Sequence, residues 1–200
     1  MWAADTVARR YGLPHDWCIT AAALSRGVLT RLGIPRVRVL GVDFAALSPL
    51  AWKLHCDGVL ASQWPDDAWI AGIRGTDHHD ETGWHGYSLA YIPSRVDGRT
   101  AWIVDPSAGQ FSNPEHQLSV PPLFAPVPTE LLGGDTAFVP FHDGGVAVRR
   151  NPTLTHHMHS AAAARPLITL LAERVQALMR APSSASRHAH ASCETGSSCL

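Results

Sequence analysis

The stretch Asp16-Trp17-Cys18-Ile19-Thr20-Ala21 opens a segment with the pattern of a helix, and it carries a cysteine in its first turn. Asp16 is a favourable N-cap residue, and apolar residues then recur at helical spacing as far as Leu32. Gly33 suits the C-cap, and Pro35 cannot continue the helix. The sequence therefore predicts a helix over residues 16–32 with Cys18 near its N-terminus.

Two strands that carry a histidine and an aspartate are predicted further along the chain. His85 begins an apolar run that predicts a strand over 85–92, and residues 100–104 predict a second strand that stops at Asp105-Pro106. The Asp97-Gly98 pair is typical of the hairpin turn between them. Folding the chain back at this turn brings His85 and Asp105 to the open end of the same hairpin.

The other segments complete an α+β pattern. In chain order the sequence predicts a short helix over 2–11, a strand over 36–42, one or two short helices and a loop within 45–83, a proline-rich extended segment with little regular structure after residue 111, a hairpin over 137–149, and a helix over 161–180. The expected fold is a set of N-terminal helices carrying the cysteine, packed on an antiparallel sheet, plus a C-terminal helix. One domain is predicted over residues 1–181, and the Ser-, Ala- and His-rich stretch 182–200 is expected to be a disordered tail.

Composition narrows the class of protein. The 200 residues are 46% hydrophobic and carry a formal net charge of −1, so no electrostatic pattern favours nucleic acid or a membrane surface as partner. The N-terminal stretch lacks the apolar core of a secretory signal, and no apolar run reaches the roughly 18 residues that span a bilayer. The four cysteines form no CxxC pair. Free thiols in a reducing, cytoplasmic setting are therefore expected.

Cys18, His85 and Asp105 together predict a catalytic triad. A cysteine attacks as the thiolate, which a helix N-terminus and a neighbouring imidazolium both stabilise. His85 would act as the base, and Asp105 would hold its ring in the working orientation. Trp17 and Trp84 flank two of these residues and are predicted to line the substrate pocket, although core packing explains them equally well.

This arrangement resembles the transglutaminase-like superfamily of papain-fold cysteine proteins. The resemblance rests on four short stretches within residues 14–111: Trp17-Cys18-Ile19-Thr20-Ala21, Leu32-Gly33-Ile34-Pro35-Arg36-Val37-Arg38-Val39, Gly83-Trp84-His85-Gly86-Tyr87 and Trp102-Ile103-Val104-Asp105-Pro106-Ser107. It implies that Cys18 is the nucleophile, His85 the base and Asp105 the orienting carboxylate, with a thioester formed from a peptide-like or amide substrate. The family often has an aromatic residue and a Glu shortly after the His, whereas this chain has Tyr87 in the aromatic place and no Glu.

The sequence thus predicts cysteine-dependent acyl transfer or hydrolysis without a cofactor, and two alternatives stay open. One is a catalytically inactive transglutaminase-like module with a binding or structural role. The other is a metal-binding protein built on the histidine clusters His78-His79-Asp80 with His85, and His156-His157-x-His159. Neither cluster has an HExxH or CxxC pattern, so no metal ligands are assigned.

Overall fold

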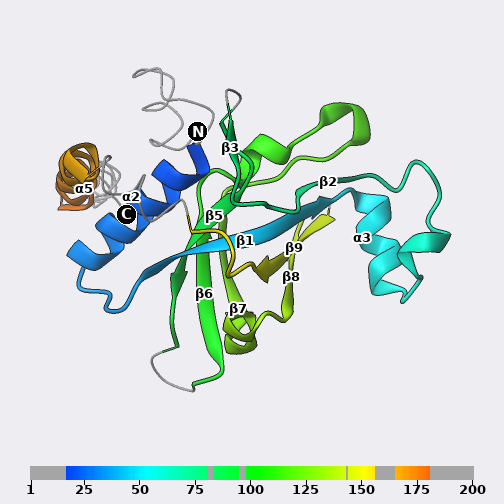
Figure 1. Cartoon of the computed structure of the whole chain (residues 1–200), viewed down its shortest axis with the longest axis horizontal. Coiled ribbons are helices and arrows are strands. Elements are labelled where there is room, and N and C mark those ends of the chain that lie inside the picture. Colours follow the sequence, from blue (N-terminus) through cyan, green and yellow to red (C-terminus); the bar gives the residue numbers. More distant parts are fainter. Residues whose placement is uncertain (1–16, 81–82, 95–97, 143, 156–164, 181–200) are drawn as a thin grey trace, which may run out of the picture.

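The computed structural model describes residues 17–80, 83–94, 98–142, 144–155 and 165–180. Within these ranges the chain is α+β, with three α-helices and a seven-stranded antiparallel sheet that curls into a nearly closed barrel (Figure 1). The helices are α2 (Trp17–Arg31), α3 (Pro49–Cys56) and α5 (Arg165–Arg180). The sheet contains β1 (Arg38–Leu47), β2 (Ile70–Ile73), β5 (Tyr87–Ile92), β6 (Thr100–Asp105), β7 (Leu123–Pro128), β8 (Thr136–Phe141) and β9 (Gly144–Arg150). A separate two-stranded pair is formed by β3 (His79–Asp80) and β4 (Gly83–Trp84).

Strand β1 is the centre of the sheet. Its first half, Arg38–Val42, pairs with β5, while the second half, Phe44–Leu47, pairs with β2 on one edge and with β9 on the other. Side chains alternate across a strand, and here Val42, Phe44 and Ala46 are the fully buried set. They join the large apolar cluster that fills the barrel.

Strand β5 is buried on both faces, since all six of its residues are excluded from solvent. Tyr87, Leu89 and Tyr91 belong to the cluster inside the barrel. Ala90 and Ile92 belong to a second apolar cluster, against which Leu29 of helix α2 packs. The strand is therefore enclosed between the barrel interior and the helix, and β5 is where the helical and sheet layers of this protein meet.

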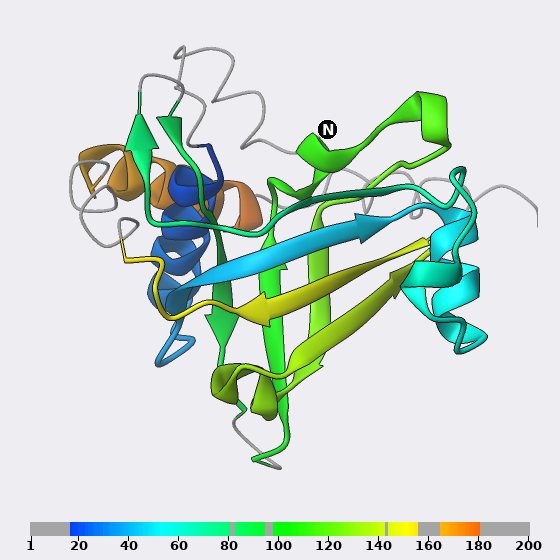
Figure 2. The same cartoon turned by 45° about the vertical axis from the view of Figure 1, so that its right-hand side comes forward.

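Helices α2 and α5 lie together at one side of the sheet, and α3 lies at the opposite end (Figures 1 and 2). Gly27 of α2 faces Ile168 of α5 so closely that a Cβ at position 27 would overlap the Ile168 side chain. Arg31 also donates to the carbonyl oxygen of Thr169 at 3.0 Å. A close glycine contact and one hydrogen bond thus fasten the last helix to the first one described.

Several sequence predictions are confirmed within the described ranges. The cysteine-bearing helix ends at Arg31, and Gly33 follows with φ of 81°, which is the left-handed conformation expected of a C-cap glycine. The predicted hairpin forms as β8 and β9, and the two strands of the predicted triad hairpin form as β5 and β6. Strand β1 extends five residues beyond its predicted end at residue 42. Strand β2 was missed, because its segment was predicted as short helices and a loop.

The proline-rich segment was predicted wrongly. Residues 123–128 form β7, which pairs with β6 along its whole length although Pro126 and Pro128 lie in it. The sheet order runs β7-β6-β5-β1-β9-β8, so β7 stands at one end of the order and needs hydrogen bonds on one edge only. Prolines are tolerated in such edge strands, because the nitrogen that cannot donate points away from the neighbouring strand.

Some predictions lie outside the described residues. These are the Asp16 N-cap, the helix over 2–11, the beginning of the C-terminal helix before Arg165, and the tail over 182–200. Among the residues that the structure describes, no helix has the length and apolar character needed to cross a bilayer.

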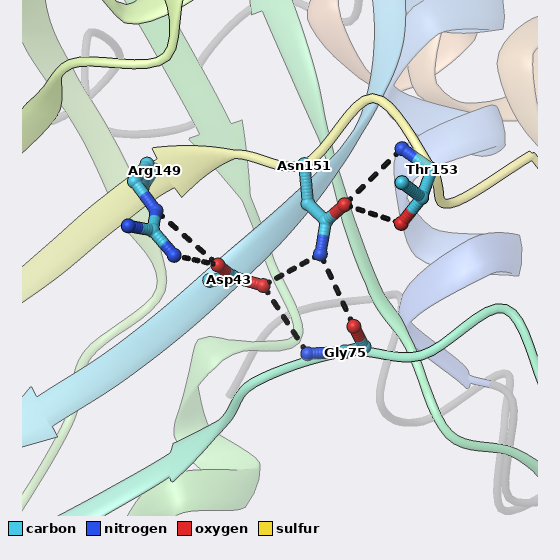
Figure 3. A network of polar contacts seen from close by, with 5 residues as sticks. All are labelled: Asp43, Gly75, Arg149, Asn151 and Thr153. Carbon is cyan, nitrogen blue, oxygen red and sulfur yellow. Dashed lines mark hydrogen bonds and ion pairs between the residues drawn. The ribbon is translucent and has the colours of Figure 1, made fainter.

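A polar network around Asp43 ties β1, β9 and the segment after β2 together (Figure 3). The Asp43 carboxylate accepts from Arg149 at 2.6 Å, from the Asn151 amide at 2.8 Å and from the Gly75 backbone at 3.2 Å. Burial raises the pKa of Asp43, but the hydrogen bonds from Arg149 and Asn151 outweigh it, so the pKa lies below its ordinary value. The same Asn151 amide donates to the Gly75 carbonyl oxygen at 3.1 Å. Asn151 therefore acts together with the direct bond from Gly75 to Asp43 to hold the chain after β2 against the barrel.

We expect Asn151→Ala to lower the free energy of unfolding by about 1–3 kcal/mol, because it leaves the partly buried acceptors of Asp43 and Gly75 without this donor. Urea unfolding followed by circular dichroism measures the change. Asn113→Ala is the matched control, because the Asn113 side chain accepts a single exposed hydrogen bond from the Glu115 backbone. Equal losses in the two variants would contradict a special role for Asn151.

Candidate active site

Cys18 lies in the first described turn of α2 and is 5% exposed. Its thiol donates to the carbonyl oxygen of Gly86, with a sulfur–oxygen distance of 4.0 Å. Gly86 directly precedes β5, so the sulfur of Cys18 lies where the first described turn of α2 meets the start of that strand. The Asp16 N-cap, which would place Cys18 at the helix N-terminus, lies outside the described residues.

Asp105 ends β6 and points into the same region, with 1% of its surface exposed. One carboxylate oxygen accepts from the Ser107 backbone at 2.9 Å and from the Ser107 hydroxyl at 2.7 Å. The other accepts from the Tyr87 hydroxyl at 2.7 Å, and the backbone N–H of Ala108 donates to the carboxylate as well. Burial raises the pKa of Asp105, and these hydrogen bonds only partly offset that effect.

Tyr87 is the side chain that joins Asp105 to the neighbourhood of Cys18. It is completely buried in the barrel, where its ring packs against Phe44 with ring centroids 4.8 Å apart. Burial raises the pKa of Tyr87 well above its ordinary value of 10.0, and the negative charge of Asp105 raises it further. The Tyr87 hydroxyl therefore remains protonated at neutral pH and acts as a hydrogen-bond donor.

His85 lies outside this buried group. Its side chain is exposed, and its ring stacks on His78 with ring centroids 5.6 Å apart. Its backbone N–H donates to the His78 carbonyl oxygen at 2.9 Å, and its own carbonyl oxygen accepts from Thr76 at 3.2 Å. Among the described residues, no hydrogen bond joins His85 to Asp105. The structure brings Cys18 and Asp105 together around Tyr87, and it places His85 in a surface cavity beside β2.

The two predicted pocket tryptophans differ in their surroundings. Trp84 is buried, its indole N–H donates to Asp77 at 3.1 Å, and a Cβ at position 86 would overlap its ring. Trp84 thus covers the Gly86 backbone that contacts the thiol. Trp17 is partly exposed at the start of the described part of α2.

Sequence reasoning missed Tyr87 and Ser107 as parts of this site. The signal that could have found Tyr87 is the two-residue period of a strand. In a strand that begins at His85, the side chains of His85 and Tyr87 point to the same face, so Tyr87 was also a candidate partner of Asp105. Ser107, two residues after Asp105, is a common partner of an aspartate in a turn. Among the described residues, no group of three or more His, Cys, Asp or Glu side chains is arranged to hold a metal ion.

Comparison of the chain with protein-family models, with curated proteins and with solved structures finds no match in any of the three. The function is therefore argued from the geometry of the described residues.

The raised pKa of Asp105 has a predictable effect on stability. Between the unfolded value near 3.8 and the higher folded value, the unfolded chain has lost this proton while the folded chain still holds it. Stability from this group therefore falls as the pH rises through that window and is constant above it. We expect the stability advantage of wild type over Asp105→Asn to shrink as the pH rises from about 4, in urea unfolding measured from pH 4 to 8.

The control for this series is Asp135→Asn, which changes an exposed aspartate in the same way. A difference between wild type and Asp105→Asn that stays constant across the whole pH range would mean that Asp105 titrates alike in the folded and unfolded chains.

Proposed function

We propose that this protein is a transglutaminase-like module in which a tyrosine has taken the place of the catalytic imidazole, so that it acts by binding and not by acyl transfer. The observation that carries the proposal is the set of donors around Asp105. A carboxylate offers about four lone-pair positions. The Ser107 hydroxyl, two backbone N–H groups and the Tyr87 hydroxyl occupy that number. An imidazole N–H that sought Asp105 would have to displace one of them.

The ionisation of Tyr87 supports the same conclusion. A general base works best when its pKa lies near the operating pH. Burial and the negative charge of Asp105 hold the pKa of Tyr87 well above that range. Tyr87 thus donates its hydrogen bond to Asp105 and cannot take the thiol proton at neutral pH. In this proposal Cys18 is a small buried apolar residue within the cluster that also contains Trp84.

A second candidate is cysteine-dependent acyl transfer or hydrolysis through a thioester on Cys18. The observation in its favour is that the Cys18 thiol, in the first described turn of α2, contacts Gly86, the residue directly after His85. For this chemistry the His85 ring would have to leave its stack with His78 and reach the sulfur. The substrate would carry an amide or ester carbonyl, and no cofactor would be needed.

Turnover separates the two candidates. We expect wild type to hydrolyse p-nitrophenyl acetate, and to release ammonia from a glutamine-containing peptide, no faster than Cys18→Ser does. His85→Ala should then behave like wild type. His142→Ala, which changes another exposed histidine, is the matched control. Turnover that requires both Cys18 and His85, but not His142, would establish the enzyme and refute the binding module.

Tyr87→His tests whether Tyr87 occupies the place of the catalytic imidazole. An imidazole beside the sulfur lowers the thiol pKa, so we expect alkylation of Cys18 by iodoacetamide at pH 7 to become about tenfold faster or more. Mass spectrometry of the Cys18 peptide measures the rate, in a chain whose other three cysteines are replaced by serine.

Tyr87→Phe is the control, because it removes the hydroxyl and keeps the ring. If Tyr87→Phe accelerates alkylation as much as Tyr87→His does, the effect comes from loosened packing around a buried thiol. The idea that Tyr87 stands in for an imidazole would then lose its support.

A further inference from the structure

We propose that the cavity beside β2 is a binding site for a small ligand that bears an oxyanion, a carboxylate or a phosphate, and that Arg74 is its main anchor. The cavity has a volume of about 570 Å³ and is lined, among others, by Ile73, Arg74, Thr76, His78, Trp84 and His85. It shares Gly72, Ile73 and Arg74 with a second hollow of about 550 Å³ that extends over the outer faces of β1 and β9. Arg74 stands where the two meet.

The charge of Arg74 is uncompensated. Its side chain is exposed, and among the described residues it has no hydrogen bond or ion pair. Two carboxylates nearby are already engaged by other donors. Asp43 accepts from Arg149, Asn151 and Gly75, and Asp77 accepts from the Trp84 indole at 3.1 Å and from the Thr155 hydroxyl at 2.6 Å. A guanidinium left without a carboxylate in a hollow is suited to an anion from solution.

The walls of the cavity are held in place by hydrogen bonds of the main chain. Directly after Arg74, the Gly75 backbone is fixed on both sides, since its N–H donates to Asp43 and its carbonyl oxygen accepts from Asn151 (Figure 3). Thr76 and His78 are each bonded to the His85 backbone. The anchor therefore projects from a rigid base, which lowers the entropy lost when a ligand is ordered.

The neighbouring side chains suit the same ligand class. The stacked rings of His78 and His85 form part of the cavity wall, and the Thr76 hydroxyl can donate or accept. Ile73 and the Trp84 ring add an apolar surface for the carbon part of the ligand. A guanidinium group binds carboxylate and phosphate through the same pair of parallel hydrogen bonds. The cavity therefore predicts a ligand with an oxyanion, and the experiment below decides between carboxylate and phosphate.

This inference is independent of the proposed function. Neither Cys18 nor Tyr87 lines the cavity, so anion binding is expected whether or not Cys18 reacts. The same titration in Cys18→Ser should therefore give the wild-type result.

The experiment is a titration of the full chain with sodium phosphate and, separately, with sodium acetate, at constant ionic strength maintained with sodium chloride. Nuclear magnetic resonance of the histidine rings and of the arginine Nε–H groups reports binding. We expect saturable shifts of His78, His85 and Arg74 with at least one oxyanion, and the stronger of the two identifies the source. Arg74→Gln should weaken that binding about tenfold or more, since it removes a charged donor.

Arg26→Gln is the matched control, because Arg26 is an exposed arginine on α2, outside the cavity. It should leave the titration unchanged, and melting temperatures should show that both variants are folded. The proposal is overturned if neither oxyanion gives saturable shifts, if chloride alone produces the same shifts, or if Arg74→Gln and Arg26→Gln have equal effects.

Discussion

The hydrogen bonds of the buried Asp105 carboxylate determine how the end of β6 and the start of β5 are arranged. A charged group removed from water must be surrounded by donors, and here they come from the turn after β6 and from Tyr87 on the neighbouring strand. These bonds position β5, β6 and the following 3-10 turn, Ala108–Phe111, relative to one another. They also use the lone pairs that a catalytic histidine would need. The donors that stabilise the fold thus occupy the acceptor positions of Asp105 that a catalytic histidine would use.

The two candidate sites of this protein, the region of Cys18 and Asp105 and the cavity of Arg74, differ in burial and in charge. Around Cys18 and Asp105 the side chains are buried, and Asp105 accepts hydrogen bonds from Tyr87 and Ser107. Burial raises the pKa values of Tyr87 and Asp105, so this region has the character of the protein core. Around Arg74 the groups are exposed and the charge is uncompensated. The short segment 84–87 connects them, because Trp84 covers the backbone near the thiol while His85 faces the surface cavity. Trp84 contacts both environments, because its ring also lines the cavity.

Local patterns predicted the parts of the fold that depend on local physics. Helix α2 has apolar residues at helical spacing and a glycine stop, and β8 and β9 alternate around an Asp-Gly-Gly turn, so both were predicted correctly. Strand β7 was missed because prolines are acceptable only at an edge, and the sequence does not state which strand lies there. The partner of Asp105 depends on where β5 begins: the strand starts at Tyr87, two residues after the predicted start, and Tyr87 is the residue that reaches the carboxylate. That offset follows from packing in the barrel, which no local pattern encodes.

The prolines of β7 have a consequence for how this protein meets other copies of itself. Strands β7 and β8 are the two ends of the sheet order, and the described residues form no ladder between them. Pro126 and Pro128 of β7, and Pro140 of β8, remove backbone donors from these terminal strands. A strand from another molecule that approached this gap would find few N–H groups to pair with. The prolines therefore disfavour edge-to-edge aggregation through β7 and β8, to which the exposed edges of an open sheet are prone.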